Sequence, residues 1–289
     1  MSYREASPDV DLAQACLPRR ISSRKGENGV VLVVGGSWLY HGAPFLVSVA
    51  ALRTGVDLVY TSVPDKISTA VRALSPSLIV LPLPDYKLTS KSVDRLYKVL
   101  DNVTAAAIGP GLAKGCEKGL VKLVDILVER NIPLVLDATA LIPDILVHVS
   151  GSRCVLTPHA GEFKRLFGID PGSGLEDRVK NVADVSGRHR VVTLLKGVVD
   201  IISNGVETVI NRKPPIAAAM TVGGTGDVLT GVVAGFLAKG TTPMSAAVGA
   251  AVANGLAGVA AAEEKGLHIT PEDLLNHLPR VLKKYDRLV

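Results

Sequence analysis

Short, continuously apolar runs recur along this chain, and stretches of helical periodicity separate them. In chain order the runs are Val30 to Val34, Leu58 to Val63, Leu78 to Leu81, Ala105 to Ile108, Leu134 to Leu136, Cys154 to Leu156 and Val191 to Leu195. A strand that helices cover on both faces has no polar side, so such runs are typical of parallel strands in βαβ units. The sequence therefore predicts an α/β fold in which helices flank a mostly parallel sheet on both sides.

Two further segments refine this prediction. Asp200 to Ser203 and Val206 to Ile210 are separated by Asn204-Gly205, a pair typical of a two-residue hairpin turn, so antiparallel strands are expected there. The stretch from Val228 to Ala262 contains one charged residue, Lys239, and resembles a membrane span in length. Because turn residues follow Lys239 and the second half is rich in Ala and Gly, two buried helices are expected instead.

Composition limits the classes of protein to consider. The chain has 289 residues, 47% of them hydrophobic, and no repeat or charged linker divides it, so a single domain over residues 1–289 is expected. The net charge of +5 is scattered and aromatic residues make up only 4%, which argues against nucleic-acid binding. The three cysteines lie far apart and the charged N-terminus lacks an apolar segment, so a cytoplasmic location without membrane attachment is expected.

Glycine and polar residues follow several of the expected strands directly. These are Gly35-Gly36-Ser37, Gly109-Pro110-Gly111, Asp137 and Thr157-Pro158-His159. In an open parallel sheet, ligands bind beyond the carboxyl ends of the strands. The loops therefore predict one rim of a binding site.

The most informative segment is Val222-Gly223-Gly224-Thr225-Gly226-Asp227, which an apolar helical stretch follows. Glycines permit close approach to the backbone, and the N–H groups at a helix N-terminus bind phosphate oxygens, so the segment predicts an anion-binding turn. It is neither a Walker A sequence nor a Rossmann glycine motif. Asp227 has two interpretations: a first-turn carboxylate that stabilises the helix dipole, or a general base that faces the group reacting at the phosphate. The entropic cost of the glycines favours the second interpretation.

GGTGDVLTG resembles the anion-hole and catalytic-Asp motif of ribokinase-like small-molecule kinases and their relatives. Further segments narrow the resemblance, in this order: Lys25-Gly26, VLVVGGSWLYHGAPFLVSVAALRTGVDLVY, AIGPGLA, LDATAL, LTPHAGEFKRLFG and LLKGVVDIIS. Together they are similar to the NAD(P)H-hydrate dehydratase family from about Leu17 to Leu282. The resemblance implies a ribokinase-like three-layer α/β/α sandwich.

The resemblance also implies the residues of the site. Contacts with the hydrated dinucleotide fall on Gly42, Ala43, Gly111, His159 and Asp227, with Asp227 as the catalytic base. Contacts with the adenine nucleotide fall on Lys196, Gly197, Val198, Val199 and Asp200, and on Gly224, Thr225 and Gly226. Plainer alternatives remain open from the residues alone: a helix start before Pro44, a strand-ending turn at Gly111, a helix cap at His159 and a solvated strand end at Lys196.

The sequence departs from the family pattern at three positions. Arg24 precedes Lys25-Gly26 where His is common, Ala160 replaces a common Pro, and Thr139 replaces a usual second Asp. Asp137 or Glu162 is a candidate to reach a metal-bound water, because Mg²⁺ keeps several waters. Thr139 weakens any scheme with two carboxylates around Asp137, so no metal ligand is assigned.

The implied reaction is the removal of water from hydrated NADH or NADPH, with ADP or ATP as co-substrate and Mg²⁺ as cofactor. The terminal phosphoryl passes to the C6 hydroxyl, phosphate then leaves, and AMP or ADP remains. A small-molecule kinase of the hydroxyethylthiazole type would use the same motif and is the alternative; a nucleotide sensor without catalysis is a third interpretation. The resemblance further implies a homo-oligomer, namely a tetramer, and the Ala/Gly-rich helix from Met244 would pack within the core or against a neighbour.

Overall fold

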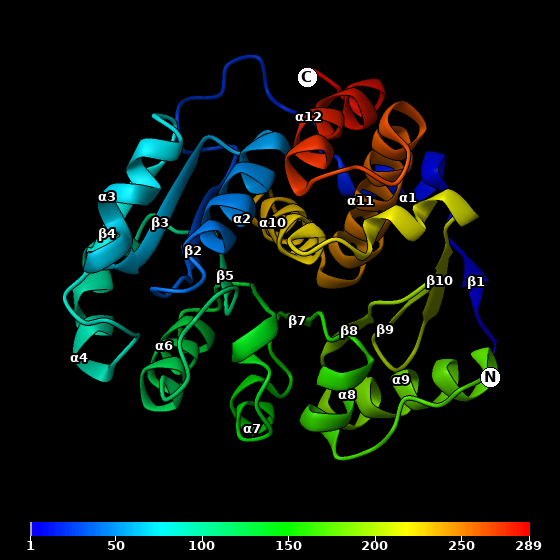
Figure 1. The fold of residues 1–289 in the computed structure, drawn as a ribbon, viewed down its shortest axis with the longest axis horizontal. Coiled ribbons are helices and arrows are strands. Elements are labelled where there is room, and N and C mark those ends of the chain that lie inside the picture. Colours follow the sequence, from blue (N-terminus) through cyan, green and yellow to red (C-terminus); the bar gives the residue numbers. More distant parts are fainter. Residues whose placement is uncertain (1) are drawn as a thin grey trace.

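One sheet of ten strands runs across the molecule, in the order β1-β10-β9-β8-β7-β6-β5-β2-β3-β4 (Figure 1). The computed structural model describes residues 2–289. Neighbouring strands are parallel except for the two pairs that involve β9. The strands are β1 Arg4–Glu5, β2 Val30–Val34, β3 Leu58–Pro64, β4 Ile79–Leu83, β5 Ala105–Ile108, β6 Leu134–Leu136, β7 Cys154–Leu156, β8 Val192–Leu195, β9 Val199–Ser203 and β10 Thr208–Arg212.

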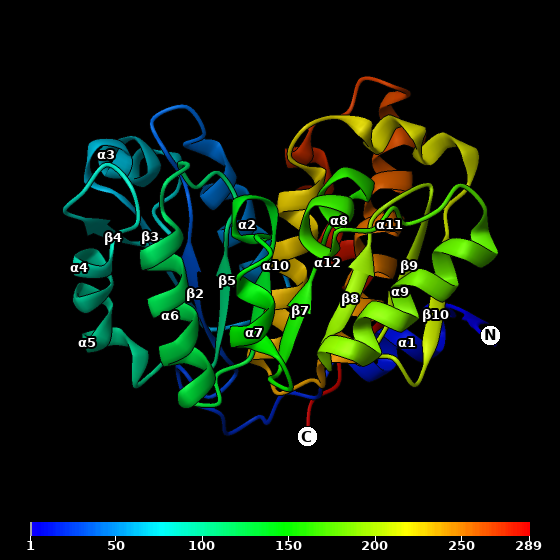
Figure 2. The same ribbon diagram turned by 90° about the horizontal axis from the view of Figure 1, so that it is seen from below.

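Helices form a layer on each face of this sheet. The α-helices are α1 Pro8–Ala15, α2 Gly42–Arg53, α3 Asp65–Leu74, α4 Ser90–Val93, α5 Tyr97–Leu100, α6 Glu117–Glu129, α7 Ile145–Val149, α8 Ala160–Phe167, α9 Leu175–His189, α10 Thr225–Ala238, α11 Pro243–Lys265 and α12 Pro271–Leu282. Short 3₁₀ helices are η1 Asp94–Leu96, η2 Ala138–Ala140, η3 Pro215–Thr221 and η4 Lys283–Tyr285. One layer contains α1, α2, α10, α11 and α12, and the other contains α4, α6, α7, α8 and α9 (Figure 1); Figure 2 shows the second layer in front of the sheet. The predicted three-layer α/β/α architecture is confirmed.

The predicted apolar runs all form strands: four have the predicted bounds, and the ends of the other three shift by one or two residues. The hairpin is antiparallel as expected, but its predicted two-residue turn is wrong. Ser203 pairs with Thr208, so the loop comprises residues 204–207 and the second strand begins at Thr208 rather than Val206. The physical reason is the Asn204 side chain, whose Oδ1 accepts hydrogen bonds from Val206 N at 2.9 Å and Glu207 N at 2.8 Å and so closes a wider turn.

Strand β1 has no counterpart in the sequence prediction. It consists of two exposed residues and pairs with β10 through the main chain. Its side chain Arg4 forms an ion pair of 2.8 Å with the buried Asp11 of α1. A strand of two residues is too short to show hydrophobic alternation in the sequence. It forms only because the edge strand β10 is available for pairing.

Helices α2 and α10 cross closely and in parallel. A Cβ at Gly231 would lie 2.2 Å from the Val47 carbonyl oxygen and 2.6 Å from Ala50 Cβ, and Thr54 lies against Gly235 in the same way one turn later. Only residues without side chains allow the two backbones to approach this far. The contact brings the N-termini of both helices to the same end of the sheet.

Helix α11 is long and apolar enough to cross a bilayer, but 72% of its most apolar stretch is buried inside the protein. It packs against α1, α10, α12 and η3. The segment 228–262 thus forms two helices, as predicted, and the Ala/Gly-rich helix packs mostly within the core of its own chain.

Candidate functional site

Several loops meet at the carboxyl edge of the sheet, where the sequence predicted a rim. Gly36 N donates to the Pro110 carbonyl oxygen at 2.9 Å and so joins the loops after β2 and β5. Lys196 N donates to the Pro158 carbonyl oxygen at 2.8 Å and joins the loops after β7 and β8. At Gly109 the backbone has φ +125°, and a Cβ there would lie 1.8 Å from the Asp137 carbonyl oxygen. A glycine is therefore required where the ends of β5 and β6 approach each other.

The predicted anion-binding turn lies at the N-terminus of α10. Gly224 caps this helix with φ +100°, and a Cβ there would lie 2.8 Å from Pro271 Cγ and 2.9 Å from Leu46 Cδ1. Thr225 Oγ1 donates to the Met220 carbonyl oxygen at 2.8 Å, and this bond stabilises the turn. The N–H groups in the first turn of an α-helix have no partner within the helix, so this turn presents donors to an anion.

A buried charge cluster lies beside the turn. Lys196 Nζ is 2.7 Å from Asp137 Oδ1 and 3.8 Å from Glu162 Oε2, and a Cβ at Gly226 would lie 3.5 Å from the same nitrogen. The Lys196 side chain is only 20% exposed, so the alternative of a solvated strand end is wrong. Burial alone would lower the pKa of the Lys196 ammonium, but the carboxylates of Asp137 and Glu162 raise this pKa above its ordinary value.

Asp227 is half-buried in the first turn of α10, as the sequence predicted. Burial and the charge of Asp137 raise its pKa, the ammonium of Lys196 opposes both, and the net result is a pKa of about 7. A carboxyl group with a pKa near neutrality is partly ionised near neutral pH, and its ionised form is basic enough to accept a proton from a substrate hydroxyl. This property favours the general-base interpretation over simple stabilisation of the helix dipole.

His159 caps α8, which is the plainer of its two predicted roles. Its Nδ1 accepts from Gly161 N at 3.0 Å and from Glu162 N at 3.3 Å, while Glu162 Oε2 accepts from His159 N at 2.9 Å. The cap fixes Glu162 next to Lys196. The ring itself remains 60% exposed and is free to contact a ligand.

A cavity of about 550 Å³ opens beside this cluster. Its walls are formed by His159, Lys196, Gly197, Val198, Asp200, Lys213, Pro214, Pro215, Ala217, Ala218, Met220, Thr221, Thr225, Gly226, Leu229, Asn254 and Gly255. Most of the residues predicted for the nucleotide thus line one cavity, polar at the Lys196 end and apolar along η3. Val199 and Gly224 are not part of the wall: Val199 packs against the core and Gly224 supports the turn.

Asp200 lines the cavity, but both of its carboxylate oxygens already accept hydrogen bonds from protein groups. Its Oδ1 accepts from Gly197 N at 3.1 Å, and its Oδ2 accepts from Asn211 Nδ2 at 3.1 Å and from Lys213 Nζ at 2.6 Å. Asp200 therefore orders the Lys196–Gly197 loop and holds a second ammonium at the cavity wall.

Three of the residues predicted for the dinucleotide, Gly42, Ala43 and Gly111, form a separate group. Ala43 Cβ lies 3.1 Å from the position of a Cβ at Gly111, and Gly42 begins α2 with Pro44 in its first turn. Both positions are outside the wall of the cavity, whereas His159 is part of it. Because α2 and α10 begin at the same end, Gly42 and Ala43 reach the carboxyl edge on the other side of the anion-binding turn.

Sequence reasoning did not identify one wall of the cavity. This wall consists of residues 213–221 together with Leu229, Asn254 and Gly255. The signal was present as Pro214-Pro215 after the hairpin, which prevents a further strand and directs the chain into η3. No local pattern indicates that Asn254 of α11 faces the same space.

A metal site built only from protein ligands is not present: among residues 2–289, no group of three or more His, Cys, Asp or Glu side chains is arranged to hold an ion. Thr139, at the position of the missing second Asp, donates to the Leu112 carbonyl oxygen instead. Both carboxylate oxygens of Asp137 have a protein partner, Lys196 and Thr230.

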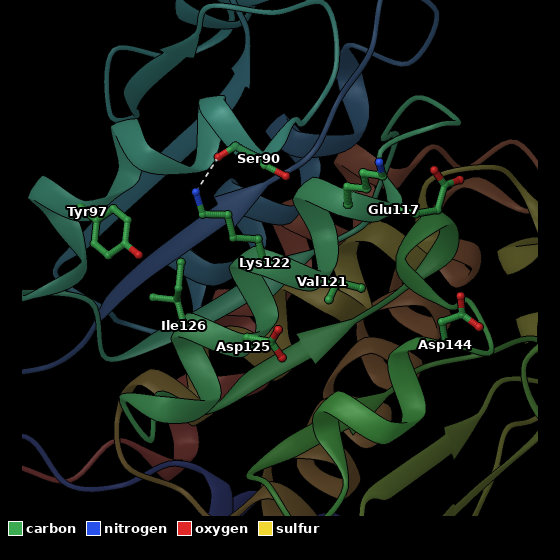
Figure 3. A pocket seen from close by; sticks show the side chains of 9 residues that line it. Ser90, Tyr97, Glu117, Val121, Lys122, Asp125, Ile126 and Asp144 are labelled. Carbon is green, nitrogen blue, oxygen red and sulfur yellow. Dashed lines mark hydrogen bonds between the residues drawn. The ribbon is translucent and has the colours of Figure 1, made fainter.

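A second hollow of about 610 Å³ lies on the opposite helical layer, away from the motif (Figure 3). It is lined by Ser90, Tyr97, Glu117, Lys118, Val121, Lys122, Asp125, Ile126 and Asp144, none of which the sequence predicted for a site. Lys122 Nζ, on its floor, donates to the Ser90 carbonyl oxygen at 3.0 Å and pairs with Asp94 at 2.6 Å.

A glycine turn at a helix N-terminus, a carboxyl group with a pKa near 7 and a buried ammonium beside a cavity define an α/β enzyme that handles phosphate groups. The chain belongs to the NAD(P)H-hydrate dehydratase family, since the model of this family matches residues 31–280. It is 52% identical over 271 residues to the ADP-dependent (S)-NAD(P)H-hydrate dehydratase of Cenarchaeum symbiosum (strain A), which covers 93% of this chain and 94% of that relative.

Solved structures agree with this assignment. The ADP/ATP-dependent NAD(P)H-hydrate dehydratase of Bacillus subtilis, co-crystallised with ATP and Mg²⁺, matches with a TM-score of 0.82 at 26% identity, over 99% of this chain and 100% of that chain. A hydroxyethylthiazole kinase from Pyrococcus horikoshii OT3 matches with a TM-score of 0.63 at 19% identity, over 96% and 92%, and shares the fold alone. The predicted family and the ribokinase-like fold are confirmed.

Proposed function

We propose that this chain dehydrates hydrated NADH or NADPH, with ADP as its preferred phosphoryl donor and Asp227 as the general base. The observation that carries the assignment of the base is the position of Asp227, half-buried in the first turn of α10 at the anion-binding turn, where burial and Asp137 raise its pKa to about 7 against the opposing effect of Lys196. The preference for ADP is supported by the relative from Cenarchaeum symbiosum, whose name specifies ADP. The nucleotide occupies the cavity beside Lys196, and the hydrated ring lies on the Gly42 side of the turn.

The reaction follows from the charges at the turn. Asp227 removes the proton of the C6 hydroxyl while that oxygen bonds to the terminal phosphorus of ADP and the bond to AMP breaks. Lys196 and the N–H groups at the start of α10 stabilise the negative charge on the transferred group. The C6–O bond then breaks as the ring nitrogen supplies its electron pair, phosphate departs, and loss of a proton from C5 restores the 5,6 double bond.

Mg²⁺ fits this site through water and the nucleotide rather than through a cage of side chains. Glu162, only 7% exposed and fixed by the His159 cap, would meet the hydration shell of the ion, with Asp137 next to it. When bound, the ion supplies charge neutralisation at the phosphates. The structure of the Bacillus subtilis dehydratase co-crystallised with ATP and Mg²⁺ supports its inclusion.

The test is a spectroscopic assay on the purified chain. Hydrated NADH supplied with ADP and Mg²⁺ is expected to regain absorbance at the reduced-nicotinamide wavelength, with AMP and phosphate as products. The same assay with ATP measures the preference between the two nucleotides. A small-molecule kinase would instead leave a stable phosphoester, and a nucleotide sensor would bind ADP without any turnover; either result would contradict the proposal.

A further inference from the structure

A buried hydroxyl lies directly behind the Lys196–Asp137 ion pair. Thr230, one turn after the anion-binding turn, is fully buried, and its Oγ1 lies 2.9 Å from Asp137 Oδ2 and 3.0 Å from the Gly226 carbonyl oxygen. A hydroxyl carries one proton, so it can donate to only one of these acceptors at a time.

The Asp137 carboxylate is the better acceptor of the two. Hydrogen bonds to an ionised acceptor are stronger than those to a neutral carbonyl. In addition, the Gly226 carbonyl oxygen stands four residues before the main-chain N–H of Thr230, which is its regular helical donor. Over residues 2–289, Asp137 Oδ2 receives no other hydrogen bond, and the residue is only 2% exposed. The buried oxygen therefore depends on Thr230.

On the basis of the proposed function, we infer that Thr230 is a positioning residue for phosphoryl transfer. Its donation to Oδ2 fixes the Asp137 carboxylate, and Oδ1 of the same group then holds Lys196 Nζ at 2.7 Å, beside Gly226. The hydroxyl touches no ligand and acts through two consecutive buried contacts. Without the Thr230 proton, the buried Oδ2 of Asp137 has no donor, and rotation of the carboxylate toward another donor would take Oδ1 away from Lys196 Nζ and release the ammonium from the turn.

A purely local role for Thr230 predicts a different outcome. Threonine hydroxyls in helices commonly bond to the carbonyl four residues earlier, and such a bond has little effect beyond the helix. In that case the loss of the hydroxyl would change stability but would leave nucleotide binding unaltered.

The matched variants are Thr230→Val, which keeps the shape and removes the proton, and Thr230→Ser, which keeps the proton. Calorimetric titration with ADP is expected to show about tenfold weaker binding for Thr230→Val, which corresponds to about 1.4 kcal/mol, because Lys196 is no longer held at the turn. Affinity within about twofold of wild type is expected for Thr230→Ser. kcat/KM for ADP should fall in parallel, while KM for the hydrated dinucleotide stays constant. Thr193→Val is the control, because this fully buried threonine of β8 has no partner for its Oγ1 among the described residues.

Two results would overturn the inference: wild-type ADP affinity in Thr230→Val, or equal losses in the valine and serine variants. If the valine variant is too unstable, Thr230→Ala, which also removes the hydroxyl proton, is compared in wild-type and Asp137→Asn backgrounds. A residue that acts through Asp137 should have no further effect on ADP binding once that carboxylate is gone, and an additive loss would contradict the coupling. ADP binding is measured without turnover, so a wild-type chain that binds ADP but fails to dehydrate would refute the proposed function and leave the comparison at Thr230 intact.

Discussion

Asp227 experiences opposing influences from two neighbouring side chains. Burial and the Asp137 carboxylate raise its pKa, and the Lys196 ammonium lowers it, with a result of about 7. This balance makes the ionised form available near neutral pH while keeping it basic enough to accept a proton. Activity that depends on Asp227 as a base should therefore rise with pH through about 7.

Replacement of Asp227 by Asn separates chemistry from structure, because the amide keeps the size but cannot accept the proton. Turnover of hydrated NADH is expected to fall by about 10²-fold or more, while ADP affinity stays constant or increases as repulsion with the phosphate disappears. Absorbance kinetics and calorimetry measure the two effects. Turnover close to that of wild type would rule out Asp227 as the base.

The same variant should also change how stability depends on pH. The pKa of Asp227 rises from 3.8 to about 7 on folding, so the wild type loses stability as pH increases from about 4 to 7, because the folded state resists ionisation. Asp227→Asn lacks this loss. Its melting temperature relative to wild type should therefore be higher at pH 8 than at pH 4, whereas loss of a helix-dipole interaction predicts a decrease at pH 8.

Lys196→Ala tests the ammonium at the turn. ADP binding is expected to weaken more than binding of the dinucleotide, because Lys196 lines the cavity proposed for the nucleotide, whereas Gly42 and Ala43 lie outside its wall. Since Lys196 lowers the pKa of Asp227, its removal should also move the acid limb of the pH–rate profile to higher pH. Calorimetry with each ligand and a pH–rate profile provide the measurements; equal losses for both ligands and an unmoved profile would contradict this role.

At the scale of elements, the parallel crossing of α2 and α10 connects the two halves of the site. One helix begins at Gly42 and carries the residues predicted for the dinucleotide, while the other begins at the anion-binding turn. The close approach at Gly231 sets the distance between these two helix starts. The relative position of the two halves of the site thus depends on how α2 and α10 pack at Gly231, farther along both helices.

Gly231→Ala should disturb both stability and the dinucleotide half of the site. The new methyl group would lie 2.2 Å from the Val47 carbonyl oxygen, so the helices must separate, at a cost of about 1–3 kcal/mol. KM for the hydrated dinucleotide should rise more than KM for ADP. The control is Gly174→Ala, an exposed position before α9 with φ −90° and only a flexible side chain nearby. Equal melting temperatures for the two variants would show that the crossing tolerates the methyl group.

At the scale of the whole molecule, we propose a homo-oligomer, a tetramer by resemblance to the family, located in the cytoplasm. Most of the apolar stretch of the Ala/Gly-rich helix α11 is buried within the chain, which favours an interface on other surfaces. Light scattering at micromolar concentration should give a mass several times the 30.2 kDa of one chain. A strictly monomeric mass would refute the proposal.

The amino-acid sequence was sufficient to predict every strand of the sheet except β1, the position of the anion-binding turn and the presence of Asp227 in the first turn of α10. These features depend on local signals: continuous apolar runs, a glycine motif and the onset of helical periodicity. The family resemblance then directed attention to Lys196 and His159, and most of the residues it implied for the nucleotide line one cavity, although Val199 and Gly224 lie outside its wall.

The hydrogen bonds and ion pairs between polar side chains far apart in the sequence depend on the tertiary structure. Asp137 is separated from Lys196 by 59 positions and from Thr230 by 93, yet one carboxylate joins both, and residues 213–221 close a cavity with Asn254 from another helix. The hairpin loop is likewise longer than predicted, because the Asn204 side chain accepts hydrogen bonds from two backbone N–H groups. The physical reason is that hydrophobic periodicity is a property of each segment's own sequence. A hydrogen bond between polar groups far apart in the chain forms only when the packing of the helices and strands holds those groups together.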